Sequence, residues 1–255
     1  MFGFCRKRRL RVSCLTASDA GKVRKDNQDC AFVDESKTVF CVADGMGGGS
    51  EGATASRFVC EAIEKTVGTR TLDDRMEAVR VVVESANAQI RAYAQEKGFK
   101  QMGSTVAVLL LDPSDPRKAA ICHIGDSRIY RVRRGSAELL TKDHTIGGEL
   151  SAFTSGTQAA DLKSRSNPLA HVLTRAIGVE DKVTPDWRKL DVEEDDKFLI
   201  CSDGVHDVVA DSLIGEILSL SGGLKAASAR LVEEVVRNGA PDNYTYVMVE
   251  IGGLA

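Results

Sequence analysis

The stretch FCVADGMGGGSEG, from Phe40 to Gly52, joins an apolar strand pattern to a glycine-rich turn. The apolar run is typical of a buried strand, and it ends on the carboxylate of Asp44. The glycines that follow allow a tight turn and leave the backbone uncovered by side chains. A helical pattern starts at Ala53. The stretch therefore predicts a strand, a turn and a helix, with a charged residue held at the end of the strand.

Apolar runs rich in Val, Ile, Phe and Tyr recur along the chain and predict further strands. These strands are Val39–Ala43, Thr105–Leu111, Ala119–Ile124, Ile129–Val132, Phe198–Cys201 and Tyr246–Ile251. Apolar residues three and four positions apart predict helices over Ala53–Val67, 74–98, Asp211–Leu220 and Leu224–Asn238. Because strands follow strands and helices follow helices, the order favours an α+β class over alternating βαβ units. We expect two stacked antiparallel sheets, each covered by a pair of helices.

Composition and charge limit the classes of function. The chain has 255 residues, of which 43% are hydrophobic and 28% charged, which is ordinary for a globular protein. Five basic residues and no acidic ones lie within residues 1–12, which predicts a basic N-terminal tail followed by a single domain over 13–255. The net charge of −3 gives no indication of nucleic-acid binding. No apolar run approaches the ~18 residues of a transmembrane helix.

The cysteines indicate a reducing compartment. There are seven of them, and no CxxC pair occurs, which argues against a zinc site. Several stand inside apolar runs, as small core residues do. Reduced thiols fit the cytosol, so we expect a cytoplasmic protein.

Aspartates recur at the ends of the predicted strands. The segments VADG, HIGD and ICSDG contain Asp44, Asp126 and Asp203, and Asp242 stands just before the last strand. Asp26 and Asp29, in KDNQD, stand just before another strand. Carboxylates brought to one edge of a sheet repel each other and raise each other's pKa unless a cation binds between them. Mg2+ and Mn2+ prefer oxygen ligands, and a pair of such ions can activate water for attack on a phosphoryl group.

A basic residue close to these aspartates is a candidate for phosphate binding. Arg24 lies in GKVRKDNQD, and its guanidinium could bind phosphate oxygens as a fork. On spacing alone, an exposed arginine beside Lys22 and Lys25 is the simpler interpretation.

These motifs together resemble the metal-dependent serine/threonine protein phosphatases of the PPM family, also called PP2C-type. The resemblance runs from about Ser18 to Ile251 and keeps the family's order of motifs: GKVRKDNQD, VADGMGG, GSTVAVLLL, HIGDSRIYRVRRG, LTKDHT, LTRAIG, LICSDGVHDVV and DNYTYVMV. The short length and the DGMGG form are similar to the compact bacterial branch. The resemblance implies a four-layer α-β-β-α sandwich. It also implies that a metal-bridging water hydrolyses phosphoserine and phosphothreonine in proteins, in opposition to a Ser/Thr kinase; we expect a monomer.

The resemblance assigns roles to individual residues. It implies two Mn2+ or Mg2+ ions, with a third left open. The implied metal ligands are Asp44 as the bridge, the carbonyl of Gly45, Asp203 and Asp242, with Asp126 at a third, weaker site. Arg24 would bind the substrate phosphate, and Asp29 would orient a metal-bound water. The segment 146–170 matches the variable flap that contacts substrate in the family.

The chain departs from the family pattern at three positions. Gln28 stands where the family usually has a glutamate, so a carboxylate close to the metals is lost. Met46 follows Asp-Gly, where some members carry a histidine as a general acid. Asn167 precedes Pro168, where the family often has histidine. His144, in KDHT, is an alternative proton donor, although such a residue is more often structural.

Three other interpretations remain open at this point. The segment CHIGDSR matches C-x-x-G-x-x-R, the phosphate loop of cysteine-dependent phosphatases, with Cys122 as nucleophile; however, a strand pattern follows it instead of a helix. Gln28 favours a non-catalytic binding module of the same family. Another two-metal phosphohydrolase, such as a nuclease, lacks support because no basic, aromatic groove is indicated.

Overall fold

Two antiparallel sheets form the centre of the computed structural model, which describes residues 10–115, 117–154, 157 and 167–254. The first sheet has the order β1 (Leu10–Asp19), β11 (Tyr244–Leu254), β10 (Lys197–Cys201), β7 (Arg128–Arg133) and β8 (Ser136–Leu139). The second has the order β2 (Asp29–Val33), β3 (Val39–Met46), β5 (Val106–Leu111), β6 (Lys118–Ile124) and β9 (Asp186–Asp191), with β4 (Gly103–Ser104) also paired to β3.

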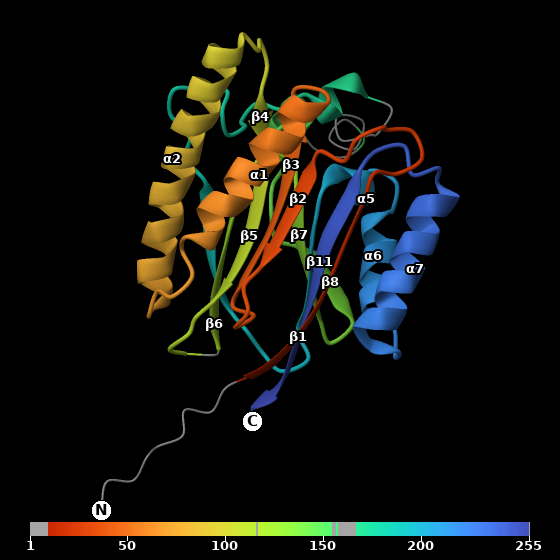
Figure 1. The fold of residues 1–255 in the computed structure, drawn as a ribbon. Coiled ribbons are helices and arrows are strands. Elements are labelled where there is room, and N and C mark those ends of the chain that lie inside the picture. The colour runs from red at the N-terminus through yellow and green to blue at the C-terminus, as the bar shows by residue number, and fades with distance from the viewer. Residues whose placement is uncertain (1–9, 116, 155–156, 158–166, 255) are drawn as a thin grey trace, which may run out of the picture.

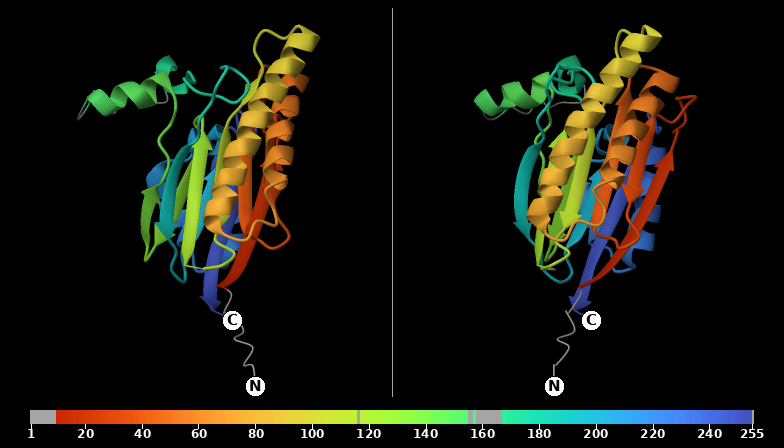
Figure 2. Two further views of the ribbon diagram at one scale, coloured as in Figure 1. Left: turned by 90° about the vertical axis from the view of Figure 1, so that its left-hand side faces the viewer. Right: turned by 60° about the vertical axis from the view of Figure 1, so that its left-hand side comes forward.

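Helix pairs cover the outer faces of the two sheets (Figure 1, Figure 2). The helices α1 (Ser50–Glu64) and α2 (Leu72–Lys97) lie on the second sheet, whereas α6 (Asp211–Leu218) and α7 (Gly223–Arg237) lie on the first. The predicted α+β class and the α-β-β-α order of layers are therefore confirmed. The short elements α3 (Ile146–Leu150), η1 (Ser151–Phe153), η2 (Pro168–His171) and α5 (Asp203–His206) lie in the connections.

Burial on both faces explains why the central strands are continuously apolar. In β3, Val39, Cys41 and Ala43 pack in the cluster beneath α1 and α2, whereas Phe40 and Val42 pack between the two sheets. A third cluster fills the space beneath α6 and α7. Each fully buried side chain of this size contributes roughly 1.5–3 kcal/mol to folding. This packing fixes the register of β3 and so the position of Asp44 near its end.

Several elements differ from the sequence prediction. β1 begins at Leu10 and pairs with β11, so three residues assigned to the predicted 1–12 tail belong to the first sheet. Residues 1–9 lie outside the described residues. β8 and β9 were not predicted as strands; β9, for example, reads DWRKLD and exposes most of its side chains at a sheet edge. A strand with so few apolar residues gives no strong local signal.

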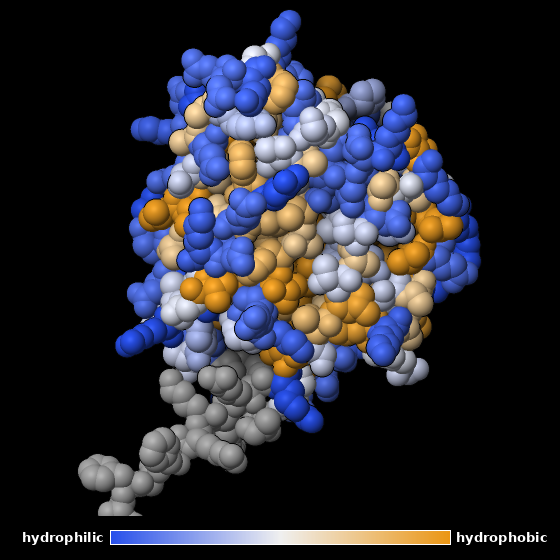
Figure 3. All heavy atoms as spheres, in the orientation of Figure 1, coloured by the Kyte–Doolittle hydropathy of each residue, from blue (hydrophilic) through white to orange (hydrophobic). Residues whose placement is uncertain are grey.

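The surface is mixed in character. On the face toward the viewer in Figure 3, polar and charged residues lie among the apolar ones that cover the middle of the molecule. Within the described ranges, no helix combines the length and the apolar character that crossing a bilayer requires.

Candidate active site

One cleft of about 1040 Å³ brings together the residues for which metal or phosphate binding was predicted. It is lined by Asp44, Asp126, Asp203 and Asp242, and by Gly45 and Arg24. These residues come from separate places in the fold: the end of β3, the β6–β7 connection, the start of α5, the turn before β11 and the loop after β1. The strand ends therefore meet at one edge of the sandwich, as the recurrence of aspartates predicted.

The cleft concentrates negative charge. Burial raises the pKa of Asp44, and the carboxylates of Asp29 and Asp203 raise it further. Burial and Asp203 likewise hold the pKa of Asp126 well above its usual range. A divalent cation would remove this repulsion, because it replaces the proton that the raised pKa values otherwise favour.

The donor set fits Mg2+ or Mn2+. Every candidate ligand is a carboxylate or a backbone carbonyl, which is the chemistry that these hard ions prefer. Asp29 supplies an independent observation. It pairs with Asp44 in the β2–β3 ladder, and its Oδ2 accepts a hydrogen bond from the Ser202 hydroxyl at 2.7 Å. Its Oδ1 is buried and has no hydrogen-bond partner among the described residues. An unsatisfied buried acceptor costs about 1–3 kcal/mol, so this oxygen is suited to a water held by an ion.

Arg24 is held at the rim of the cleft by a ligand candidate. Its Nη2 donates to Oδ2 of Asp242 at 2.7 Å, and about half of the Arg24 side chain is exposed. The guanidinium is therefore close to the predicted metal ligands and remains open to solvent. The interpretation from spacing alone, an exposed arginine, agrees with this exposure, but it did not include the contact with Asp242.

Asn243 is a site residue that sequence reasoning missed. Its Nδ2 donates to the carbonyls of Ala20 and Asp26, both at 2.9 Å, and its Oδ1 accepts from the Gln28 amide at 2.8 Å. Asn243 is buried and thereby fixes the Arg24 loop beside Asp242. The only sequence signal was the Asp-Asn pair, which is equally typical of a simple turn.

A buried pair of hydroxyl groups holds Asp44. The amide of Asp44 donates to Oγ1 of Thr105 at 2.9 Å, and the amide of Thr105 donates to the Asp44 carbonyl at 2.8 Å. Thr105 Oγ1 lies 2.7 Å from the Ser127 hydroxyl, one residue after Asp126. The two predicted ligands are thus joined through backbone and hydroxyl contacts. Neither hydroxyl was predicted, although Thr105 lies in the GSTVAVLLL motif.

Gln28 has two roles: its backbone carbonyl joins neighbouring elements by hydrogen bonds, and the residue lines the cleft. Its carbonyl accepts from the Gly45 amide at 3.1 Å and from the Ser56 hydroxyl at 2.6 Å. These contacts tie the loop before β2 to the end of β3 and to α1. The neutral side chain lines the cleft without adding charge.

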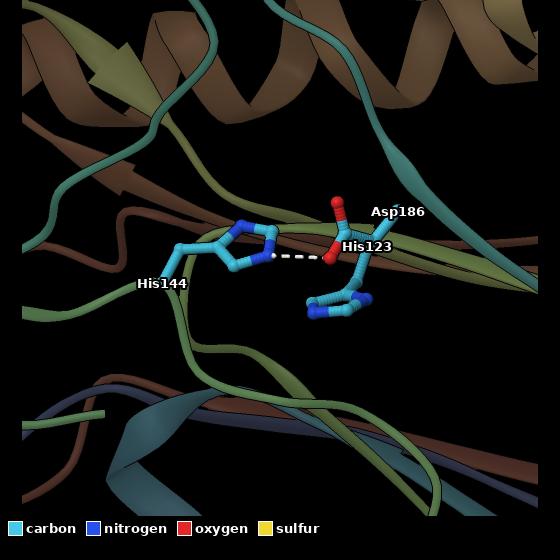
Figure 4. A group of neighbouring side chains, drawn as sticks. All are labelled: His123, His144 and Asp186. Carbon is cyan, nitrogen blue, oxygen red and sulfur yellow. Dashed lines mark hydrogen bonds and ion pairs between the residues drawn. The ribbon is translucent and has the colours of Figure 1, made fainter. Parts of the chain in front are cut away.

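His144 supports the loop of Asp126 from behind. Its Nδ1 accepts from the Gly125 amide at 3.1 Å, and its own amide donates to the Gly125 carbonyl at 3.0 Å. Its Nε2 lies 3.3 Å from Oδ2 of Asp186, and Figure 4 shows the His144 ring pointing toward that carboxylate. Burial, and after it the charge of the stacked His123, lower the pKa of His144 to about 4. His144 is buried and does not line the cleft, so the alternative of a proton donor there is wrong.

His123, His144 and Asp186 are residue types that could bind a metal, and their side chains lie close together. The hydrogen bonds of His144, however, place a proton on the nitrogen that would have to bind the metal. Because Nδ1 of His144 accepts a hydrogen bond, the proton of the neutral ring sits on Nε2, which donates to Asp186. A metal would need the lone pair of that same Nε2. Asp186 is also engaged by Arg175, Nη1 to Oδ1, at 2.7 Å. His144 and Asp186 form a hydrogen-bonded support for Gly125, and His123 stacks on the His144 ring.

Cys122 does not form an anion-binding loop. Its side chain is fully buried in the cluster under α1 and α2, and burial raises the pKa of its thiol far above the usual range. Strand β7 follows instead of a helix. Both observations contradict the cysteine-phosphatase interpretation, which requires an accessible thiolate at a helix N-terminus.

The predicted flap, 146–170, is described in part. Residues 155–156 and 158–166 lie outside the described residues. Asn167 caps η2, where its Oδ1 accepts from the Leu169 amide at 3.0 Å. Met46 lines the cleft, and so does His171, which the sequence reasoning did not single out.

Comparison with known proteins identifies the family of this fold. A family model described as protein phosphatase 2C matches residues 17–247. The serine/threonine phosphatase stp of Listeria welshimeri is 30% identical over 241 residues, which cover 91% of this chain and 93% of stp. PppA, a regulatory component of the T6SS in Pseudomonas aeruginosa, has a TM-score of 0.83 at 31% identity, with 94% of this chain and 97% of PppA covered.

One of the similar solved structures contains metal ions. The catalytic domain of the serine/threonine protein phosphatase PstP, in complex with two manganese ions, has a TM-score of 0.78 at 30% identity. The likeness covers 96% of this chain and all of that domain. From the span of the family match and the identity to these phosphatases, we conclude that the chain belongs to the protein phosphatase 2C family.

Proposed function

We propose that this protein hydrolyses phosphoserine and phosphothreonine in proteins at the cleft of Asp44. The observation that carries the proposal is the convergence of four aspartates, the Gly45 carbonyl and Arg24 on that one cleft. Asp44, the Gly45 carbonyl, Asp203 and Asp242 would hold two divalent ions, and Asp126 would hold a third. When bound, such ions supply positive charge for the phosphoryl oxygens and make water easier to deprotonate.

The remaining residues position the reactants. The unpartnered Oδ1 of Asp29 would accept a hydrogen bond from the attacking water and orient it. Arg24 would bind two phosphoryl oxygens through its guanidinium fork. Because Asp242 would share its negative charge with an ion, it would compete less for Arg24. The exposed guanidinium could then turn to the substrate.

The test is hydrolysis of a phosphothreonine peptide by the full chain, with Mn2+, with Mg2+ and with EDTA. We expect turnover with either ion, none in EDTA, and full recovery when the ion is returned. Alkylation by N-ethylmaleimide should leave the activity unchanged, since Cys122 is buried. Turnover that persists in EDTA and disappears on alkylation would contradict the proposal. A protein that binds Mn2+ and the phosphopeptide without turnover would be a binding module.

Replacing Arg24 with alanine tests the phosphate contact. Hydrogen bonds to a charged group contribute about 1.5–3 kcal/mol, so kcat/KM for the phosphopeptide should fall about 10- to 100-fold. The half-saturating Mn2+ concentration should not rise, because the change leaves Asp242 free. Lys25→Ala is the matched control: it removes the same charge one residue away, outside the cleft lining, and should change kcat/KM less than about twofold. Equal effects of the two variants would show that Arg24 acts only through general charge.

We also propose a cytoplasmic monomer that opposes a Ser/Thr kinase. The cysteines of the described residues are free, which fits a reducing compartment. A phosphatase of this substrate class requires a kinase to form its substrates. Sedimentation of the Mn2+-loaded protein at one chain's mass, 27.4 kDa, would support the monomer, and a concentration-dependent dimer would contradict it.

A further inference from the structure

His171 stands at the junction of the active-site cleft and a second cavity of about 510 Å³. The second cavity is lined by Asp126, His206 and Asp207, among others. Among the described residues that line the cleft, His171 is the one histidine. Its Nδ1 lies 3.1 Å from Oδ2 of Asp207, and about 40% of the side chain is exposed.

Asp207 connects this histidine to the metal-ligand aspartates. The amide of Asp207 donates to the Asp203 carbonyl at 2.8 Å, one helical turn back, so Asp207 follows Asp203 on the same side of α5. Burial alone would raise the pKa of Asp207, but His206 and His171 hold it below its usual range. The carboxylate therefore stays negative beside the imidazole, and its contact with Nδ1 orients the ring.

The backbone after His171 is anchored independently of the residues that the structure does not describe. The amide of Ile146 donates to the Val172 carbonyl at 2.9 Å, and the amide of Thr174 donates to the His144 carbonyl at 2.8 Å. Thr145 and Leu173 form a β-bridge. His171 is thereby attached to the same segment that supports Gly125, next to Asp126.

The proposed reaction requires a proton donor close to the leaving serine or threonine oxygen. When water attacks phosphorus, the bond from phosphorus to the serine or threonine oxygen breaks, and its electron pair stays on that oxygen. An alkoxide is strongly basic and leaves poorly unless it is protonated as the bond breaks. Met46 has no proton to give, and the guanidinium of Arg24 does not deprotonate in proteins.

We propose that His171, oriented by Asp207, is the catalytic acid that protonates the leaving serine or threonine oxygen; this inference rests on the proposed function. The imidazolium gives its proton to the leaving oxygen as the bond to phosphorus breaks. The attacking water loses a proton to solvent, and the neutral imidazole takes a proton from solvent before the next turnover. Asp207 keeps its charge throughout and stabilises the imidazolium.

The test compares substrates that differ in their need for an acid. For His171→Gln in the Mn2+-loaded full chain, kcat for the phosphothreonine peptide should fall about 100-fold. The kcat for p-nitrophenyl phosphate should change less than about threefold, because nitrophenolate leaves without protonation. Across a series of aryl phosphates, the rate of the variant should fall more steeply as the leaving group becomes more basic.

Leu169→Ala is the matched control, since Leu169 lies in the same 3-10 helix, is exposed and lines neither cavity. It should leave both substrates unaffected. Equal losses of His171→Gln on both substrates, or no loss on the peptide, would overturn the inference. If the wild-type protein hydrolyses neither substrate with Mn2+, the proposed function fails. If the wild type hydrolyses both substrates but His171→Gln does not lose activity selectively on the peptide, only the inference about His171 fails.

Discussion

Asp44→Asn is expected to lower kcat for a phosphothreonine peptide about 1,000-fold, which corresponds to about 4 kcal/mol of transition-state stabilisation. Asp29, Asp126 and Asp203 cluster around the Asp44 carboxylate, so under the proposed function Asp44 would hold both ions. The amide is a weaker ligand and carries no charge. Titration calorimetry should show loss of at least one Mn2+ site, and steady-state kinetics should show the fall in kcat.

The same change should stabilise the metal-free protein. With EDTA present, the substitution removes one charge from a group of mutually repelling carboxylates. A gain of about 1 kcal/mol would raise the melting temperature by about 2–4 °C in a chain of this size. Asp26→Asn is the control, because Asp26 is exposed and outside the cleft lining, and it should change neither activity nor melting. Retained turnover, or a lower melting temperature in EDTA, would argue against Asp44 as the bridge.

The gain in metal-free stability should depend on pH. Burial raises the pKa of Asp29 to about 6, and burial also raises the pKa of Asp44. A carboxylate whose pKa is higher in the folded state binds more protons there, so its contribution to stability falls as the pH rises from the unfolded to the folded value. The cost is absent below the unfolded value near 4 and grows up to the folded value, which is about 6 for Asp29 and is also raised for Asp44. The difference in melting temperature between the wild type and Asp44→Asn, measured in EDTA, should therefore shrink as the pH is lowered from 7.5 to 5.

Gly45→Ala is expected to lower the free energy of unfolding by about 3 kcal/mol and to abolish metal-dependent turnover. An added Cβ would lie 1.9 Å from the Gly52 carbonyl oxygen and 2.7 Å from that of Gln28. Both contacts are to backbone, so relief requires that α1 and the loop before β2 move away from β3. That movement would displace the Gly45 carbonyl and Asp44 together. Urea unfolding and Mn2+ titration of the variant measure the two effects.

Gly98→Ala separates this contact effect from backbone strain. Gly98 ends α2 with a φ of +73°, and an added Cβ there would meet nothing within 4 Å. Its cost should be about 1 kcal/mol, from the left-handed conformation alone, with activity unchanged. If Gly45→Ala cost no more than Gly98→Ala, the crowding between β3 and α1 would be unimportant.

The strongly patterned elements were predictable because their signal is local. β3, β5 and β10 are continuously apolar, and α2 repeats its apolar residues every three or four positions. β9 and β1 escaped prediction because edge strands bury little and their hydrogen bonds come from distant partners. At Cys122 the sequence suggested a feature that the fold does not have. The motif matched an anion-binding loop, but the Cys122 side chain is buried in β6, which excludes such a loop there.

By itself, the sequence determined the class of fold, the aspartates at the strand ends and the glycine turn after Asp44, because periodicity and turn chemistry act over a few residues. Tertiary structure alone decided which of these residues meet. The Arg24–Asp242 contact spans 218 positions in the chain, and the hydrogen bonds of Asn243 reach back 217 and 223 positions. The pairing of His171 with Asp207 likewise depends on how α5 and the segment after η2 pack. Such contacts form only when the sheets stack and bring remote strand ends to one edge, which no local pattern encodes.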